Sequence, residues 1–393
     1  MSLVTEQLDS LAKRGFSRRQ IGRIGALISA GAALPFYNEF AMAQDAAQQQ
    51  RPGRGAGGGM RRAMDPDAVV INQNENPMGP CKEGLEAIAA VAPHGWRYNP
   101  GSESSDFRNA AAEQLGVKPE YILSTAGSSD PLHAATCAFT SPTRSWVMAN
   151  PGYGGGAPAF IGSKVVRVPL ADDYSHDVRA MLKADPDAGA YYICNPNNPT
   201  ATLTSRKDIE FLLANKSKDA VVVVDEAYIH FTEKAVSAAD LVAADKDVVV
   251  LRTFSKIYGM AGLRAGFAAA RPELLQKMRP YSSSGFLPVT GLACAAASMK
   301  VKNLVAERRG RMTQVRESVF AYFEKKGISF VPSEANFFML EAKRPHAEFA
   351  QAMAAQKVIV GRQWPIWPTK VRVTVGTQEE MNKFIAAVDK VWA

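Results

Sequence analysis

Residues 251–267 read Leu-Arg-Thr-Phe-Ser-Lys-Ile-Tyr-Gly-Met-Ala-Gly-Leu-Arg-Ala-Gly-Phe, and this stretch decides how the rest of the chain is interpreted. Three valines precede it and, with its first leucine, predict a short buried strand. A lysine at the end of such a strand, here Lys256, loses its charge more easily, and the neutral amine is a nucleophile. The hydroxyls of Thr253 and Ser255 and the guanidinium of Arg264 suit a phosphate dianion. The stretch alone is equally compatible with a surface turn that carries a solvated lysine.

Two further predicted strands end in polar residues. Residues 221–224 are four valines followed by Asp225, a pattern typical of a strand buried on both faces of a parallel sheet. Ligands of open α/β sheets bind at the C-terminal ends of strands, where a carboxylate needs a cationic partner such as a pyridinium nitrogen. Residues 191–194 predict a second strand, followed by the rigid polar loop 195–200, Asn-Pro-Asn-Asn-Pro-Thr. An amine, a pyridinium partner and a phosphate cluster are the three parts of a pyridoxal phosphate site.

With these motifs the chain resembles the fold-type-I pyridoxal-phosphate aminotransferases, and most closely their histidinol-phosphate aminotransferase branch. The resemblance covers residues 68–392, and its motifs follow the order and spacing of the family. It implies an α/β fold, with a large domain built on a mostly parallel seven-stranded sheet and a smaller C-terminal α/β domain. It also implies transfer of an amino group between an amino acid, or a related amine, and a 2-oxo acid. The cofactor would be pyridoxal 5'-phosphate, and the enzyme a homodimer with shared active sites.

The resemblance assigns a role to each residue of the cofactor site. Lys256 would hold the cofactor as a Schiff base and, once freed, move the proton between substrate and cofactor. Asp225 would keep the pyridine nitrogen protonated, and Tyr153 would stack on the ring. Asn198 and Tyr228 would bond the ring hydroxyl. Seven residues would hold the phosphate: Tyr98, Gly127, Ser128, Ser129, Thr253, Ser255 and Arg264.

The predicted phosphate contacts at the turn around Gly127 and at Tyr98 each rest on a separate argument. Gly127 lies in a turn that opens a predicted helix, and free N–H groups at a helix N-terminus bind anions. The serines at positions 128 and 129 stand where many relatives have acids, but backbone contacts do not need the acids. Tyr98 would reach the phosphate of the partner subunit, which places the active site at a twofold interface. An aromatic residue that only packs is the alternative for Tyr98.

The substrate-binding residues are predicted from the arm and from the C-terminal third. Asn76 lies in an Asn-Glu-Asn-Pro stretch similar to the family's arm that crosses to the active site, although a plain turn would explain it. Arg372 alternates with apolar neighbours on a predicted strand, where an inward arginine needs an anion, and the family's substrate-binding arginine has this position. Arg362 approximates a second family arginine but is displaced by one residue.

The loop between these arginines carries Trp364, Trp367 and two prolines. The prolines stiffen the loop and the tryptophans offer flat apolar surfaces, so we expect an aromatic or bulky apolar donor. Packing of both tryptophans within the small domain is the alternative. Ala201 also departs from the family, which usually has glycine here, and a positive φ at this position would strain it.

The N-terminus is predicted to be an export signal. Ser-Arg-Arg-Gln-Ile at residues 17–21 resembles a twin-arginine motif, and the apolar run that follows is too short for a stable membrane span. Ala-Met-Ala at residues 41–43 fits a cleavage site. We therefore expect residues 1–43 to be a twin-arginine signal peptide and the protein to be periplasmic. A disordered basic tail is the alternative.

The remaining chain divides into a linker and two folded units. Residues 44–67 lack apolar periodicity and predict a flexible linker. We assign residues 68–92 to an N-terminal arm that belongs to the small domain, residues 93–292 to the large cofactor-binding domain, and residues 293–393 to the small C-terminal domain.

Composition limits the other possible partners. The net charge of +8, without a long basic helix, is weak evidence for nucleic-acid binding, so none is expected. The four cysteines lack CxxC and Cys/His spacing, so we expect buried free thiols and no metal site. A lyase or decarboxylase on the same scaffold would use the same cofactor residues and remains open. A non-catalytic pyridoxal-phosphate-binding protein is a further alternative, against which the intact Lys256 argues.

Overall fold

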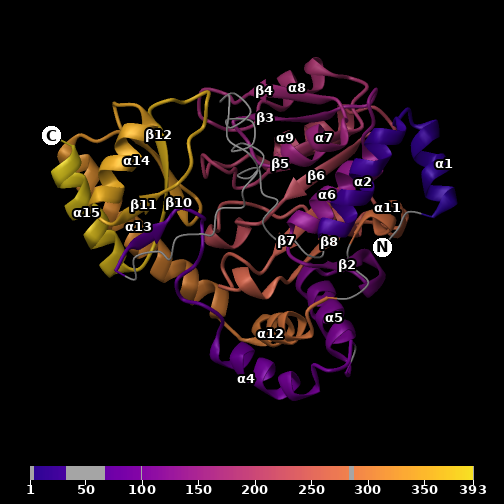
Figure 1. The fold of residues 1–393 in the computed structure, drawn as a ribbon, viewed down its shortest axis with the longest axis horizontal. Helices are drawn as coiled ribbons and strands as arrows, with labels where there is room; N and C mark the ends of the chain where they lie inside the picture. The colour runs from indigo at the N-terminus through magenta and orange to yellow at the C-terminus, as the bar shows by residue number, and fades with distance from the viewer. Residues whose placement is uncertain (1–3, 32–66, 99, 283–286, 393) are drawn as a thin grey trace.

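The computed structural model describes residues 4–31, 67–98, 100–282 and 287–392. Figure 1 shows a large α/β domain with a smaller C-terminal unit on one side and the N-terminal helices on the other. The central sheet contains β2 (Ile122–Thr125), β3 (Trp146–Asn150), β4 (Val165–Pro169), β5 (Ala190–Cys194), β6 (Val221–Asp225), β7 (Val248–Thr253) and β8 (Gly266–Ala269). Their order is β2-β8-β7-β6-β5-β3-β4, and only β8 runs antiparallel to its neighbours. The predicted mostly parallel seven-stranded sheet is thereby confirmed.

The three central strands are buried along their whole length. Every residue of β5, β6 and β7 is buried, as expected for strands covered by helices on both faces. Because these strands are parallel, their C-terminal ends lie at one edge of the sheet and deliver their following loops to one place. The helices of this domain are α5 (Glu103–Leu115), α6 (Ser129–Phe139), α7 (Gly156–Ile161), α8 (Val178–Ala184), α9 (Arg206–Asn215), α10 (Ala239–Ala243), α11 (Pro272–Met278) and α12 (Val289–Lys300).

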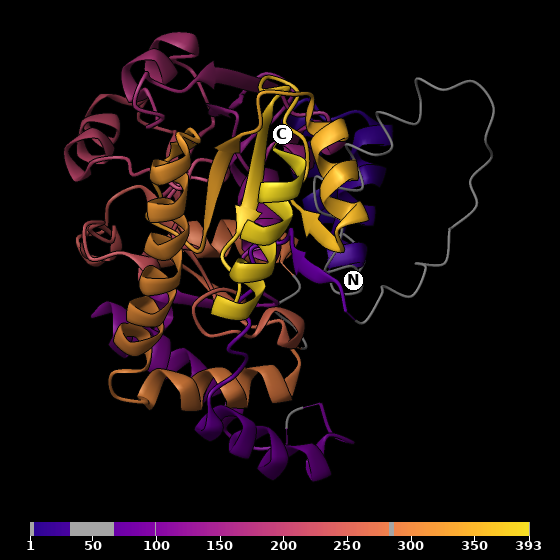
Figure 2. The same cartoon turned by 90° about the vertical axis from the view of Figure 1, so that its left-hand side faces the viewer.

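The small domain combines the start of the arm with the C-terminal part of the chain (Figure 2). Its antiparallel sheet has the order β12 (Lys370–Thr374), β10 (Phe337–Glu341), β9 (Phe330–Val331). A second sheet pairs β1 (Val69–Ile71) in parallel with β11 (Val358–Val360), which brings the start of the arm into this domain. The helices are α13 (Leu304–Lys326), α14 (His346–Ala355) and α15 (Gln378–Val391).

The arm divides between the two domains. Its helix α4 (Lys82–Val91) packs on α12, and Figure 1 shows the two helices side by side. Helix α12 also contacts α5 of the large domain and runs without a break across the boundary at 292/293. The change of domain on the C-terminal side therefore falls after α12.

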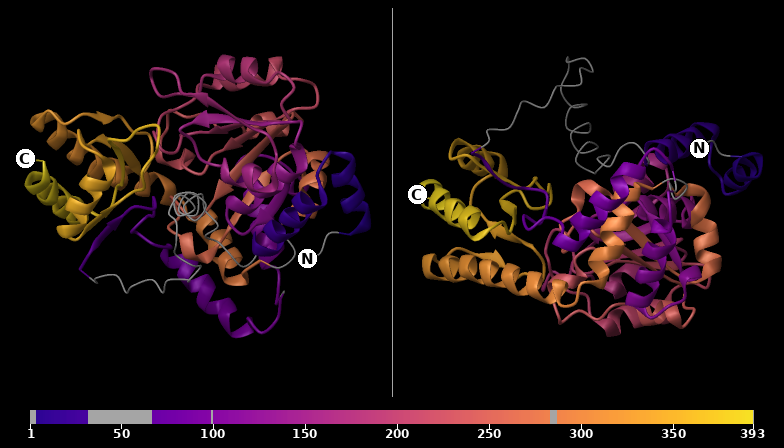
Figure 3. Two further views of the ribbon diagram at one scale, coloured as in Figure 1. Left: turned by 45° about the horizontal axis from the view of Figure 1, so that its top comes forward. Right: turned by 90° about the horizontal axis from the view of Figure 1, so that it is seen from below.

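The N-terminal segment forms two helices, α1 (Thr5–Lys13) and α2 (Arg18–Gly31), that pack against the large domain on the side away from the C-terminus (Figure 3). Leu11 and Ile24 are fully buried there, and α2 contacts α6 and α7. Arg14 donates to the carbonyls of Cys137 and Thr140 at the end of α6. The cleavage pattern and almost all of the linker lie outside the described residues. Within the described ranges no helix is long and apolar enough to cross a membrane.

Candidate active site

Lys256 lies three residues after β7, at the edge where the parallel strands end. Its Nζ donates to the backbone oxygens of Asn74 at 3.0 Å and Gln73 at 3.2 Å, and it lies 5.6 Å from the centre of the Tyr228 ring. Burial and the nearby positive charge of Arg372 lower the pKa of this amine to about 8. The amine is therefore partly neutral near physiological pH, which a nucleophile requires.

Asp225 is the last residue of β6 and is 2% exposed. Its two oxygens accept from the Tyr192 hydroxyl at 2.8 Å and from the backbone N–H of Ala227 at 3.0 Å. Burial raises the pKa of this carboxyl to about 6, against the effect of these hydrogen bonds. A cationic partner stabilises the ionised form of such a buried carboxyl, and a pyridinium nitrogen is a partner of this kind.

A cluster of hydroxyl and guanidinium groups lies beside the lysine. Thr253 and Ser255 are buried and bonded to each other through their hydroxyls at 2.9 Å. Arg264 Nη1 donates to the Ser255 hydroxyl at 3.2 Å, and its Nη2 donates to the carbonyl of Ala126 at 2.9 Å. A Cβ on Gly127, where φ is +82°, would lie 2.3 Å from this Nη2, so only glycine permits the contact.

The first turn of α6 completes this cluster. The N-cap residue, Ser128, makes no side-chain capping bond, and Ser129 is the first helical residue. The N–H groups of such a turn are suited to an anion. The cluster thus carries donors suited to a phosphate group, and its contact with the cofactor phosphate stays a prediction.

The loop after β5 meets the small domain. Asn198 is buried, and its Oδ1 accepts from Arg372 Nη1 at 2.8 Å. Arg372 lies on β12, also donates to the carbonyl of Asn72 at 2.8 Å, and has its guanidinium 5.8 Å from the Phe337 ring centre. Ala201 has a φ of 59°, so the left-handed conformation that the sequence put in question is present and strains an alanine.

The arm supplies a second set of polar contacts. Asn74 Nδ2 donates to the buried Tyr228 hydroxyl at 3.1 Å. The side chain of Asn76 is engaged within the chain, because its Nδ2 donates to the carbonyl of Ile257 at 2.9 Å and its Oδ1 accepts from Met78 N. Asn76 therefore ties the arm to the turn that carries the lysine, and its contact with substrate stays a prediction.

Three predicted residues lie at the margin of this group. Tyr153 is partly buried and packs on the main hydrophobic core. Tyr98 is 81% exposed and belongs to the segment after α4. Arg362 stacks over the Trp364 ring at 3.9 Å.

Comparison with known proteins decides the family. Residues 66–388 match the family "Aminotransferase class I and II". The chain belongs to this family. The histidinol-phosphate aminotransferase of Symbiobacterium thermophilum is 34% identical over 330 residues, which cover 82% of this chain and 90% of the relative. The aromatic amino acid aminotransferase of Cutibacterium acnes is 32% identical, with 82% and 92% covered.

The fold of this aminotransferase is also that of solved structures. The histidinol-phosphate aminotransferase of Sinorhizobium meliloti, crystallised in complex with pyridoxal 5'-phosphate, matches with a TM-score of 0.76 at 24% identity, covering 83% of this chain and 90% of that one. The protein is a pyridoxal-phosphate-dependent aminotransferase of fold type I that uses amino acid and 2-oxo acid substrates. The predicted fold class, enzyme class and cofactor are confirmed.

The residues present fit the cofactor of this aminotransferase. Arg264 Nε is buried without a hydrogen-bond partner in the described part of the chain. Asp225 is buried with a raised pKa and is suited to a cation. Between them, Lys256 provides an amine with a lowered pKa.

Sequence reasoning missed several residues of this aminotransferase site. Tyr192 and Asn74 bind two of the predicted cofactor residues, and Asn336 Nδ2 donates to the carbonyls of Asn74 and Glu75. A signal for Tyr192 existed, because it lies two residues before the end of a strand and faces the same side as that end. Its partner could not be identified without the register between β5 and β6.

Proposed function

We propose that this aminotransferase takes a donor amino acid with an aromatic or bulky apolar side chain. The observation that carries the proposal is a buried apolar cluster of Val331, Met339 and Trp364, which lies on the same sheet face as Arg372. We infer that Arg372 binds the donor carboxylate and that the cluster forms a wall against the side chain.

The sheet register supports this arrangement. Met339 of β10 lies directly opposite Arg372 of β12 and opposite Val331 of β9. Residues that are directly opposite in a sheet have side chains on the same face. The Arg372 guanidinium reaches Asn198 of the large domain, so this face is turned toward the predicted cofactor residues.

The outer part of the cluster is aromatic and partly exposed. Tyr174 and Trp367 pack on the cluster and meet edge to face, with their ring centroids 5.6 Å apart. The Lys370 ammonium lies 5.8 Å and 5.9 Å from these two ring centres. Apolar surface with a cationic rim suits an amino acid whose side chain is apolar and whose other end is anionic.

The relatives do not decide between donors, because their names include both histidinol-phosphate and aromatic amino acid aminotransferases. The proposal is tested by measuring kcat/KM for phenylalanine, tyrosine, leucine, alanine and histidinol phosphate with a panel of 2-oxo acids. We expect the aromatic and bulky apolar donors to be preferred. A clear preference for histidinol phosphate would contradict the proposal.

The proposed roles of the site residues follow from their positions. Bound pyridoxal phosphate supplies an electron sink for negative charge at the substrate Cα. Lys256 holds and then moves the proton at that carbon, because its amine has a lowered pKa at the strand end. Asp225 would provide the negative charge that keeps the pyridine nitrogen protonated. The Tyr228 hydroxyl, to which Asn74 donates, and Asn198 would bond the ring hydroxyl.

We propose that the phosphate group is held by Thr253, Ser255, Arg264 and the first turn of α6. This cluster carries donors and a positive charge, and the missing side chain at Gly127 lets the Arg264 guanidinium lie against the turn that opens α6. The phosphate would anchor the cofactor whether or not the lysine is bonded to it.

We propose a homodimer in which Tyr98 completes the partner's site. Trp96 and Tyr98 are 73% and 81% exposed, which is unusual for large aromatic side chains and typical of an interface. Co-expression of Lys256→Ala and Tyr98→Phe chains tests this, because a mixed dimer would contain one site with both native residues. Activity well above that of either variant is expected, and no recovery would contradict the shared site.

Export through the twin-arginine pathway to the periplasm is also proposed. Arg18 and Arg19 begin α2 and are exposed, whereas Ile24, Leu27 and Ile28 of the same helix are buried against the folded body. The helix must therefore detach before it can serve as a signal.

Cell fractionation tests the export proposal. Replacement of both Arg18 and Arg19 by lysine should retain the protein in the cytoplasm, and Lys13→Arg, outside the pair, is the control. Undiminished delivery of the Arg18→Lys, Arg19→Lys variant to the periplasm would contradict this route.

A further inference from the structure

A buried ion pair lies directly behind the proposed cofactor site. Glu226 follows Asp225, and Arg252 precedes Thr253, so each member of the pair is next to a proposed cofactor residue. The Arg252 and Glu226 side chains are 7% and 1% exposed, and Arg252 Nη2 lies 2.7 Å from Glu226 Oε2. Arg252 Nε donates to the same oxygen at 2.8 Å. This two-point contact fixes the angle as well as the separation of the two groups.

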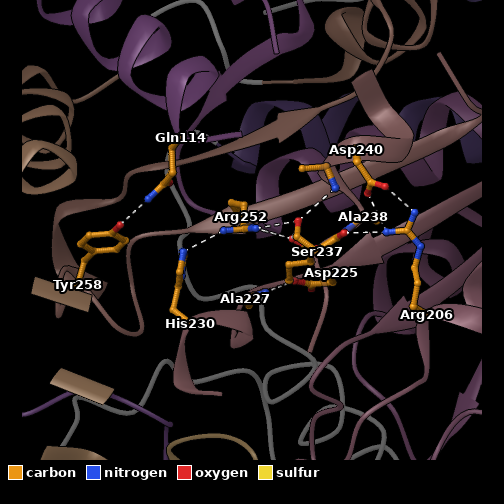
Figure 4. Close-up of polar contacts among 12 residues, drawn as sticks. Gln114, Arg206, Asp225, Ala227, His230, Ser237, Ala238, Asp240, Arg252 and Tyr258 are labelled. Carbon is orange, nitrogen blue, oxygen red and sulfur yellow. Dashed lines mark hydrogen bonds and ion pairs between the residues drawn. The ribbon is translucent and has the colours of Figure 1, made fainter. Parts of the chain in front are cut away.

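Neighbouring groups satisfy the remaining polar atoms of the pair, as Figure 4 shows. Arg252 Nη1 contacts His230 Nε2 at 2.9 Å, and Arg252 Nη2 donates to the Ser237 hydroxyl at 3.1 Å. Glu226 accepts from the Ser237 hydroxyl at 2.9 Å and from the backbone N–H of Ala238 at 2.7 Å. Burial, with the charges of nearby arginines, lowers the pKa of His230 well below its usual range, so the ring is neutral and Nε2 accepts from Arg252.

The pair connects two strand ends that carry different parts of the site. Glu226 N donates to the carbonyl of Leu251, which continues the β6–β7 ladder. Side chains alternate along a strand, so Arg252 points away from the face to which Thr253 points. Glu226 joins Arg252 on that opposite face. The ion pair and the proposed cofactor residues therefore occupy opposite faces of the same two strand ends.

The pair also closes the loop that carries Tyr228. This loop leaves β6 at Glu226 and returns at Ser237 and Ala238, both of which bond to Glu226. His230, within the loop, bonds to Arg252 and packs edge to face on Tyr258, with their ring centroids 5.6 Å apart. Both ends and the middle of the loop are therefore held by one pair of charges.

We propose that Glu226 and Arg252 are positioning residues that set the spacing between Asp225 and Tyr228 on one strand end and Thr253 and Ser255 on the next. The pyridine ring is rigid and the link from the ring to the phosphate is only two atoms long, so the two sets of contacts can be made together only over a narrow range of spacings. Without the pair the strands remain, but the two halves of the site no longer bind at once. The inference rests on the proposed cofactor roles of Asp225 and Thr253.

The test measures affinity for pyridoxal phosphate and thermal stability in the same variants. Glu226→Gln combined with Arg252→Met removes both charges and preserves side-chain volume, so no buried charge is left alone. Arg252→Lys keeps the charge but loses the two-point contact. This variant replaces the double variant in the binding measurement if the double variant does not fold. The dissociation constant of pyridoxal phosphate is measured with cofactor-free protein, well below the unfolding temperature.

Three controls separate positioning from general weakening. Arg206→Gln breaks an outer ion pair with Asp240, whose side chain is 65% exposed, and Arg206 also contacts the Ser237 carbonyl at the edge of the network. Leu212→Ala creates a cavity in α9 and lowers stability without touching the pair. Asp225→Asn tests the assigned cofactor role itself.

We expect the double variant to bind pyridoxal phosphate at least tenfold more weakly, while Arg206→Gln and Leu212→Ala stay within twofold of the parent protein. Affinity within twofold in the folded double variant, or an equal loss in Leu212→Ala at equal stability, would overturn the positioning role. If Asp225→Asn changed neither affinity nor turnover, the cofactor assignment would fail instead. The two failures are thus distinguishable.

Discussion

Replacement of Arg372 by alanine should remove most of the activity toward amino acids. The side chain is 7% exposed, and its guanidinium already donates to Asn198 Oδ1 and to the carbonyl of Asn72, both at 2.8 Å. It is therefore held rigidly before the substrate arrives. Loss of one partner of such a buried, hydrogen-bonded pair costs about 2–5 kcal/mol. That corresponds to a reduction in kcat/KM of roughly 30-fold to several-thousand-fold.

The same substitution also removes two hydrogen bonds inside the protein. Each contributes about 1 kcal/mol, so the free energy of unfolding should fall by about 2 kcal/mol. Activity must therefore be measured well below the unfolding temperature. Arg372→Lys keeps the charge without the planar two-point contact, and we expect its kcat/KM to be intermediate.

Comparison of phenylalanine with phenylalaninol isolates the carboxylate contact. Phenylalaninol lacks the carboxylate, so Arg372→Ala should reduce its kcat/KM by less than about threefold. A loss of this size is what indirect effects of the substitution would cause. Transamination is followed by the appearance of the new amino acid from the 2-oxo acid. An equal loss for both donors would refute the proposed contact with the carboxylate.

Four other predictions concern the lysine, the strained loop and the apolar wall. Lys256→Ala should abolish turnover and the absorbance band of the bound cofactor with little change in unfolding temperature, and retained turnover would contradict its role. Because the pKa of Lys256 is about 8, the amine is mostly protonated below that pH, so cofactor uptake by the cofactor-free protein should speed up with pH, with a midpoint near 8. A midpoint near 10 would contradict a buried amine. Ala201→Gly should raise the free energy of unfolding, measured with denaturant, by about 1 kcal/mol or less, because glycine adopts a φ of 59° without strain. A lower free energy of unfolding would contradict the strain. Trp364→Ala and Trp367→Ala should lower kcat/KM more for phenylalanine than for alanine, whereas equal losses would show that they only pack the small domain.

The central sheet and most of the site were predictable because their signals are local. The valine runs before Asp225 and Lys256 predict buried parallel strands, and the polar residues after them follow directly along the chain. The four cysteines are buried and free, as composition and spacing predicted.

Contacts between distant parts of the chain were not predictable. The bond from Tyr192 to Asp225 depends on the register of β5 against β6. The pair of Glu226 and Arg252 depends on the register of β6 against β7. Strand periodicity shows which face a side chain occupies but not which residue of the next strand lies beside it.

The N-terminal helices illustrate a second reason why some contacts were not predictable from the sequence. Their apolar residues predicted a segment separate from the folded body, whereas the structure packs Leu11, Ile24 and Leu27 against the large domain. An apolar helical face looks the same in sequence whether it meets an export receptor or the protein's own surface.

A competition experiment tests the central proposal most directly. Phenylalanine, alanine and histidinol phosphate are supplied together at equal concentration with one 2-oxo acid, and all amino and oxo products, ammonia and CO₂ are quantified. The proposal predicts that phenylalanine is consumed first, with one new amino acid formed for each oxo acid released and no ammonia or CO₂. Preferential consumption of histidinol phosphate, or release of ammonia or CO₂ in place of amino exchange, would contradict it.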